Sequence, residues 1–322
     1  MMRRARGTRR RGWLLAAAKL AVSASLLVLL ARRSHAAEVW ASVQSIPPAA
    51  FVAAWTLLLA QSLILGLRWW LVMDALGAPL GYARTVRLTF VGAFFNQVLP
   101  TSFGGDAVRI WQAYRSGVRP DAAINGVALE RVSGLVGLAL MVAVGLWWFG
   151  PRIDSPGLRL GLLAAVPLVM LGIGLAACLD RMPETWRKWR AARGLVRLAA
   201  DTRRIFIAPT VLAPLLLLSL VSHGLAALAV YAFADGLGLA VTAWECLALV
   251  PPVILITLFP VSFAGWGVRE GAMVTMLAFA GIGAEAALAV SLAFGGALLA
   301  AALPGCILWL AGRATTAAQS AA

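Results

Sequence analysis

Long apolar runs alternate with short polar or basic connections along nearly the whole chain. A helix needs about 20 mostly apolar residues to cross a hydrocarbon core of about 30 Å. Six runs meet this requirement, so the pattern predicts six transmembrane helices. They lie at residues 13–31, 49–73, 121–149, 157–179, 207–233 and 285–312.

Two further apolar segments, residues 84–119 and 244–280, are interrupted by proline and glycine. In the first, the apolar part from Leu88 to Leu99 has twelve residues. It spans only about 18 Å at helical rise, which is too short to cross a bilayer. A polar, amphipathic part follows at residues 106–116. We therefore predict a re-entrant, broken-helix hairpin in each of these segments.

The interruption occurs twice. Residues 99–109 read LPTSFGGDAVR and residues 259–269 read FPVSFAGWGVR, with six of eleven positions identical at an offset of 160 residues. The same offset maps span 49–73 onto 209–233 and span 121–149 onto 281–309. Each half then contains an odd number of crossings, so the second half is inverted, as in transporters built from two broken-helix repeats. The two hairpins are expected to enter from opposite faces and to meet near the midplane.

Composition agrees with an all-α integral membrane protein. The chain is 61% hydrophobic with a mean hydropathy of +0.87, which leaves too little polar surface for a soluble globule of 322 residues. Its net charge of +15 could suggest nucleic-acid binding. The basic residues lie mostly between apolar spans, however, where the positive-inside rule places them, so we expect no nucleic-acid partner.

The basic residues also predict the topology. With both hairpins re-entrant, the N-terminus, Arg109, the basic loop 181–204 and Arg313 all face the cytoplasm. We predict a basic cytoplasmic N-terminus (1–12), one transmembrane domain (13–312, with halves 13–150 and 157–312) and a cytoplasmic tail (313–322). The expected location is the bacterial inner membrane.

The first apolar run follows six arginines within residues 3–11 and could be a secretory or twin-arginine signal. Ser34-His35-Ala36 would be a poor cleavage site. We favour a retained first span, because the run is long enough to cross and the topology requires an internal N-terminus.

A proline and glycine break at membrane depth must face protein or a water-filled cavity, since lipid cannot satisfy the freed backbone groups. The helix that follows each break presents its N-terminus, a natural anion site, and an arginine one turn later offers a forked donor for phosphate. The candidate substrate-binding residues are Asn96, Ser102, Gly105, Arg109, Ser262, Gly265 and Arg269. The alternatives are that the glycines only bend the chain and that Asn96 satisfies the carbonyls of the broken helix.

Ionisable residues deep in a span are functional hypotheses by default. Asp106, Glu130, Arg131 and Glu270 are candidates for charge pairing or proton coupling. Asp106 could instead cap a helix. Glu130 and Arg131 could form a neutralising pair, and Glu270 could do the same with Arg269.

Two other sets of residues are given structural roles. His223 is interpreted as a packing residue, because nothing near it in the sequence identifies a partner. Residues 68–70, Arg-Trp-Trp near the end of a span, suit the interfacial belt.

The sequence contains no Walker A loop, GxSxG elbow, HExxH motif or metal-ligand cluster, and its three cysteines lie in separate apolar segments. We therefore expect no metal, no cofactor and no enzymatic activity. An intramembrane enzyme that uses Glu130 as an acid or base is a weaker hypothesis, because no nucleophile is evident.

The chain resembles the lysylphosphatidylglycerol synthase transmembrane-region family of flippase-like proteins, from about residue 13 to 312. The resemblance lies in Asn96-Gln97-Val98-Leu99-Pro100 with Gly104-Gly105-Asp106 and Arg109, in Glu130-Arg131 with Gly134-Leu135, and in Pro260-Val261-Ser262 with residues 265–270, GWGVRE. It implies a lipid-linked role, with translocation of phospholipids or polyprenyl-type lipids proposed for the family. It does not imply synthase activity, which belongs to a separate soluble module, and it does not identify the substrate.

These observations favour a flippase that moves an anionic or phosphate-bearing lipid across the inner membrane, with membrane lipids as its partners. The alternative is a non-transporting scaffold that holds a glycosyltransferase or lipid-modifying enzyme and uses the 181–204 loop as its docking surface. The sequence does not indicate an oligomeric state.

Overall fold

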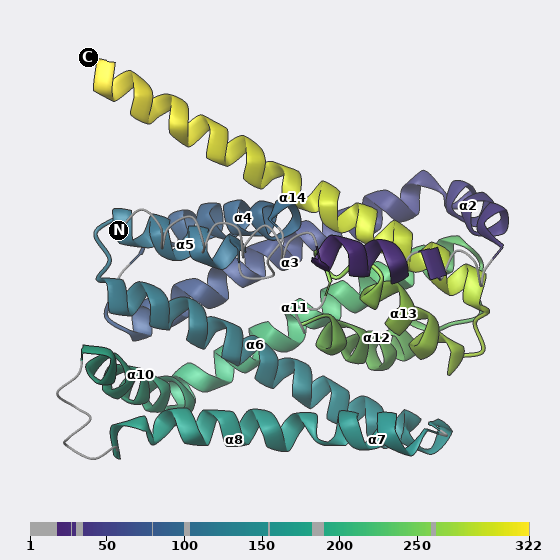
Figure 1. Ribbon diagram of the computed structural model, residues 1–322, viewed down its shortest axis with the longest axis horizontal. Coiled ribbons are helices and arrows are strands. Elements are labelled where there is room, and N and C mark those ends of the chain that lie inside the picture. Colours follow the sequence, from purple (N-terminus) through teal and green to yellow (C-terminus); the bar gives the residue numbers. More distant parts are fainter. Residues whose placement is uncertain are drawn as a thin grey trace.

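The computed structural model describes residues 18–26, 28–29, 35–78, 80–99, 104–153, 155–181, 190–258 and 262–321. All regular secondary structure in these ranges is helical (Figure 1). In chain order the elements are α2 (Ala36–Ser45), α3 (Pro48–Ala75), α4 (Tyr82–Val98), α5 (Gly104–Arg115), α6 (Pro120–Phe149), η1 (Gly150–Arg152), α7 (Pro156–Leu163), α8 (Ala165–Ala177), η2 (Leu179–Arg181), α10 (Arg190–Phe206), α11 (Pro209–Gly236), α12 (Ala243–Thr257), α13 (Val268–Ala278) and α14 (Ala284–Ala321).

Within the described ranges, five helical stretches are long and apolar enough to cross a membrane. They are Pro48–Ala75, Pro120–Arg152, Pro156–Ala177, Pro209–Gly236 and Ala284–Gly312, which correspond to five of the six predicted spans. The first predicted span, 13–31, is described only at residues 18–26 and 28–29, which are helical. The predicted N-terminal segment 1–12 lies outside the described residues. The chain is therefore an all-helical, multi-pass membrane protein.

Two segments differ from the expected connections. The polar stretch before Pro47 contains the helix α2, and most of the predicted 181–204 loop is the helix α10. In α10, Arg197 and Arg204 are exposed, whereas Ala199 and Ile205 are fully buried against the bundle. Arginine is a good helix former and its long stem covers apolar surface, so a basic segment with this periodicity folds as an amphipathic helix.

Each interrupted segment folds back on itself. The helices α4 and α5 are in contact across their break: a Cβ on Gly105 would lie 1.9 Å from the carbonyl oxygen of Gly92. The helices α12 and α13 also pack against each other. At 17 and 15 residues, α4 and α12 are about 26 and 22 Å long, less than a hydrocarbon core of about 30 Å. Both breaks therefore produce short helical hairpins.

The long helices α3 and α11 pack against each other and run antiparallel (Figure 1). Gly236, at the end of α11, contacts Ala50 at the start of α3. Arg68, near the end of α3, donates to Ser219 near the start of α11. Both helices are 28 residues long.

Two long helices, α6 and α14, cross between the two halves. Helix α14 packs on α4, where Gly305 lies against the carbonyl of Phe90. Helix α6 packs on α12, where Gly145 lies against the carbonyl of Ala248. Gly145 and Gly305 are also separated by 160 residues. Each hairpin is thus covered by a long helix from the other half of the chain.

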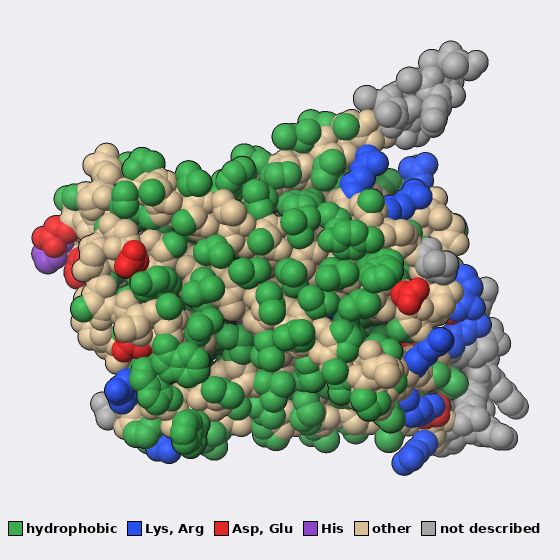
Figure 2. Space-filling view, turned by 180° about the vertical axis from the view of Figure 1, so that it is seen from behind, with side chains coloured by type: hydrophobic (Ala, Val, Ile, Leu, Met, Phe, Trp, Pro, Cys, Tyr) green, Lys and Arg blue, Asp and Glu red, His purple; other side chains and the backbone are tan. Residues whose placement is uncertain are grey.

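The surface has an apolar band between two polar ends (Figure 2). One end holds α10, the α5–α6 turn and the start of α4, as the contacts of Arg197 with Asp121 and of Asn125 with Asp201 show. Exposed arginines gather at this end: Arg84, Arg87, Arg115, Arg119, Arg197 and Arg204. The opposite end carries α2 and the turns around residues 150 and 240.

Candidate functional site

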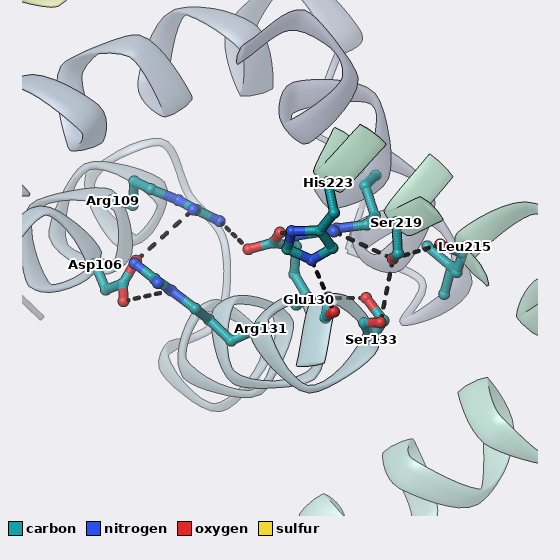
Figure 3. Close-up of polar contacts among 10 residues, drawn as sticks. Asp106, Arg109, Glu130, Arg131, Ser133, Leu215, Ser219 and His223 are labelled. Carbon is teal, nitrogen blue, oxygen red and sulfur yellow. Dashed lines mark hydrogen bonds and ion pairs between the residues drawn. The ribbon is translucent and has the colours of Figure 1, made fainter. Parts of the chain in front are cut away.

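A buried ion network connects three helices around Glu130 on α6 (Figure 3). Its Oε1 accepts from Nε of Arg68 on α3 at 3.0 Å, and its Oε2 accepts from Nη2 of Arg109 on α5 at 3.1 Å. Arg68 also donates to Oγ of Ser219 on α11. The carboxylate is 2% exposed, so two guanidinium groups from different helices compensate its charge.

The network continues toward the first break through Asp106 on α5 (Figure 3). Its Oδ1 accepts from Nη2 of Arg131 at 3.0 Å, and Nη1 of Arg109 lies 3.7 Å from the same oxygen. Glu130 and Arg131, neighbours in sequence, therefore pair with different partners and not with each other. Asp106 thus forms an ion pair, as one hypothesis proposed, and it also lies in the first turn of α5. Three guanidinium groups face two carboxylates, which leaves one positive charge in excess.

Trp69 does not belong to an interfacial belt, contrary to the sequence-based expectation for the tryptophans of this span. Arg68 is 4% exposed and Trp69 is fully buried. The guanidinium of Arg109 lies over the indole of Trp69, 4.2 Å from the ring centroid. Stacking of this kind favours arginine and fixes the plane of its donors.

The second half has a smaller buried pair. Nε and Nη2 of Arg269 donate to Oε1 of Glu270 at 3.0 and 2.6 Å, and both residues are at most 5% exposed. The other oxygen of Glu270 accepts from the backbone N–H of Gly267 and caps α13. Arg269 lies over the indole of Trp266, 4.5 Å from its centroid. The expected pairing of Glu270 with Arg269 is thus present in the structure.

At the first break, Asn96 accepts a hydrogen bond from the N–H of Gly105 at 2.8 Å. Asn96 therefore satisfies a backbone N–H of the break, whereas its structural interpretation assigned it to the carbonyls of the broken helix. Gly105 has no room for a side chain, because the hairpin closes on it. Ser102 lies outside the described residues.

The second break is formed by left-handed backbone. Ala264, Gly265 and Gly267 have φ of 48°, 83° and 86°, a conformation that favours glycine. Ser262 is buried in this turn. The N–H of Phe263 donates to Oγ of Ser23 at 2.8 Å, so the N-terminal helical segment holds the turn.

A cavity of about 270 Å³ lies between the two halves. It is lined by Asn96 and Arg131 from the first half and by Gly265 and Arg269 from the second. Three of these four were predicted as substrate-binding residues, and Arg131 was predicted as a charge-pair residue. Arg109, Gly105, Ser262 and the carboxylates are not among the residues that line it. The remaining polar lining is Gln61, Gln97 and Thr257.

Sequence reasoning missed Arg68, Gln61, Gln97 and Ser219. Arg68 carried a usable signal, because a charge inside an apolar span is rare and functional or paired by default. Gln61, Gln97 and Ser219 carry no such signal.

His223 contacts the carbonyl oxygen of Gly134 through Nε2 at 3.0 Å. In the described part of the chain, no group of three His, Cys, Asp or Glu side chains is arranged to hold a metal ion.

The fold and the site together define a polytopic membrane protein in which two broken-helix hairpins and buried arginines surround a cavity. A comparison with curated protein sequences finds no match. The chain matches the family described as "Lysylphosphatidylglycerol synthase TM region" over residues 16–305. It belongs to this family, as the resemblance implied, and the family suggests a membrane function related to lipids.

Proposed function

We propose that this protein is a flippase that moves an anionic or phosphate-bearing lipid, a phospholipid or a polyprenyl-type lipid, across the membrane. The main support for this proposal is the cavity between the two hairpins, which is lined by one arginine from each half. A guanidinium group binds phosphate through paired donors. The excess positive charge of the buried network is suited to one anionic ligand.

We also propose that the two halves form an inverted repeat. The helices α3 and α11, which the sequence repeat relates, are in contact and antiparallel. A two-fold axis that superposes one on the other must therefore lie perpendicular to both helices. The hairpins support the same symmetry. Helix α4 starts at the end of the bundle that carries α10, whereas Trp244 at the start of α12 contacts Trp148 at the opposite end. Opposed hairpins that converge on a central cavity are typical of such transporters.

The arginine-rich end is proposed to face the cytoplasm of a bacterial inner membrane, with both chain termini on that side. The positive-inside rule supports this orientation, because the exposed arginines of α10 and of the turn after α5 lie together. The hairpin α4–α5 would then enter from the cytoplasm and α12–α13 from outside.

Transport is favoured over catalysis by the surroundings of Glu130. The nearby hydroxyls of Ser133 and Ser219 donate to backbone carbonyls, so neither is held as a nucleophile against the carboxylate.

A scaffold for a glycosyltransferase or a lipid-modifying enzyme is the second candidate, because α10 offers a basic, exposed face. Charge reversal at Arg204 separates the two: a scaffold loses its partner, whereas a flippase keeps its transport.

The test is lipid translocation in proteoliposomes that contain a fluorescent anionic phospholipid, with a membrane-impermeant quencher to follow its sidedness. Arg269→Ala and Arg131→Ala are expected to slow translocation at least about tenfold, since each removes charged hydrogen bonds to phosphate. Arg159→Ala, an exposed arginine at the opposite end, is the matched control. Unchanged transport in both cavity variants, with intact folding by size-exclusion chromatography, would contradict the proposal.

A further inference from the structure

The cavity wall has an unusual balance of charge. Besides Arg131 and Arg269, its polar residues are the amides of Gln61, Asn96 and Gln97 and the hydroxyl of Thr257. Among the described residues that line it there is no carboxylate and no lysine. The wall therefore combines positive charge with neutral hydrogen-bonding groups.

The nearest carboxylates are engaged behind the wall. Both oxygens of Asp106 contact the guanidinium of Arg131. One oxygen of Glu270 accepts a hydrogen bond from Arg269, and the other accepts from the N–H of Gly267. An ammonium group inside the cavity would thus meet guanidinium groups at the wall, while the carboxylates that pair with them lie behind it, and this arrangement disfavours a cation.

The amide side chains of the wall indicate which chemical group accompanies the phosphate of the ligand. The oxygen of Asn96 accepts from the N–H of Gly105, which leaves its NH₂ group for a ligand. No hydrogen bond within the described part of the chain engages the side chains of Gln61 and Gln97. Carboxamides donate and accept, as hydroxyl groups do, so together they suit a polyol.

The size of the cavity is compatible with a small headgroup. At about 270 Å³ it lies just below the roughly 300–1,000 Å³ typical of pockets for drug-sized ligands. It accommodates a phosphate with one small substituent.

Building on the proposed function, we propose that the cavity selects a phospholipid whose headgroup is a phosphodiester with an uncharged, hydroxylated substituent. It rejects amine-bearing headgroups, including the lysyl-modified headgroup named in the family description. Phosphatidylglycerol has the required chemistry. Arg131 and Arg269 bind its phosphate, and the amides bind its hydroxyls.

The experiment measures lipid retention by native mass spectrometry of the purified protein in mixed micelles. The micelles contain equal amounts of phosphatidylglycerol, lysylphosphatidylglycerol, phosphatidylethanolamine and phosphatidic acid. We expect phosphatidylglycerol to be retained at least about tenfold over both amine-bearing lipids and severalfold over phosphatidic acid, which lacks the hydroxyls. Wild-type protein that retains lysylphosphatidylglycerol equally well or better overturns the headgroup assignment and leaves translocation standing. Retention of no anionic lipid overturns the proposed function itself.

Isosteric charge changes provide the sharper test. Gln61→Glu and Gln97→Glu each add a carboxylate to the wall without changing its shape, and each is expected to move the preference toward the amine-bearing lipids by about tenfold. Gln44→Glu, on the exposed surface of α2, is the control and keeps the wild-type preference. Folding of each variant is monitored by thermal unfolding. A folded Gln97→Glu protein with the wild-type preference would contradict the assignment.

Discussion

Arg109 and Arg269 stand 160 residues apart, and each guanidinium lies over an indole ring, 4.2 Å from the centroid of Trp69 and 4.5 Å from that of Trp266. The two tryptophans do not correspond in sequence, because Trp69 lies on α3 and Trp266 in the turn before α13. The halves thus reach the same local arrangement, an arginine between an indole and a carboxylate, with different residues. Only the second arginine lines the cavity.

Replacement of Glu130 by glutamine is expected to destabilise the protein strongly. The change removes the charge that compensates Arg68 and Arg109, and breaking a buried pair costs about 3–5 kcal/mol. Denaturant unfolding in detergent micelles measures the loss. Glu285→Gln, at a surface carboxylate that is 35% exposed, serves as the control and should change the free energy of unfolding by less than about 0.5 kcal/mol. Equal stabilities of the two variants would show that Glu130 is not the compensating charge.

Gly145 on α6 and Gly305 on α14, which occupy equivalent positions of the repeat, are expected to tolerate alanine to different degrees. A Cβ on Gly305 would lie 2.0 Å from the carbonyl oxygen of Phe90, and one on Gly145 would lie 2.8 Å from that of Ala248. Both would force helices apart, since small residues allow close approach in membranes. Thermal unfolding should rank Gly305→Ala below Gly145→Ala, and both below the wild type. Gly296→Ala, where a Cβ meets open space, should not lower the melting temperature, since alanine is the better helix former. A Gly305→Ala protein as stable as Gly296→Ala would argue against the α4–α14 contact.

Loss of the Ser23 hydroxyl should loosen the second hairpin. Ser23→Ala leaves the N–H of Phe263 without its acceptor, at a cost of about 1–3 kcal/mol. Hydrogen exchange of the Phe263 amide, followed by mass spectrometry, is expected to accelerate. Ser25→Ala, on the exposed side of the same helical segment, is the control. If exchange is the same in both variants, the N-terminal segment does not hold the turn.

The orientation of the bundle can be tested by labelling. Single cysteines at Gly194 on α10 and at Gly157 on α7 occupy open space on the two polar ends. In a background without Cys178, Cys246 and Cys306, an impermeant maleimide added to intact cells should label Gly157→Cys only. After permeabilisation it should label both. Labelling of both positions in intact cells would contradict the proposed topology.

The sequence predicted the long helices and both hairpins because their signals are local. Apolar length identifies a span, and proline with glycine identifies a break. The repeat around Pro100 and Pro260 then related the two halves without any knowledge of contacts. The sequence-based prediction of a loop at α10 rested on its charge and missed the helical spacing of Ala199, Thr202 and Ile205, which are buried.

The partners within the site could not be predicted in the same way. Glu130 and Arg131 are adjacent in sequence, but neighbouring helical residues point in different directions, so each finds its partner on another helix. Which helix that is depends on how α3, α5 and α6 cross. The same holds for Trp69, whose position near the end of a span suggested an interface until its neighbours were known.

The exchange of long helices between the halves has a consequence for biogenesis. Helix α4 of the first hairpin, which ends at Val98, is covered by α14, which begins only at Ala284. At 5–20 residues per second, about 10–40 s pass between the emergence of α4 and that of its cover. The buried charges of α5 do not depend on this cover, because Glu130 and Arg131, which pair with Arg109 and Asp106, lie on α6 of the same half. A truncation before α14 would expose the face of α4 that holds Phe90.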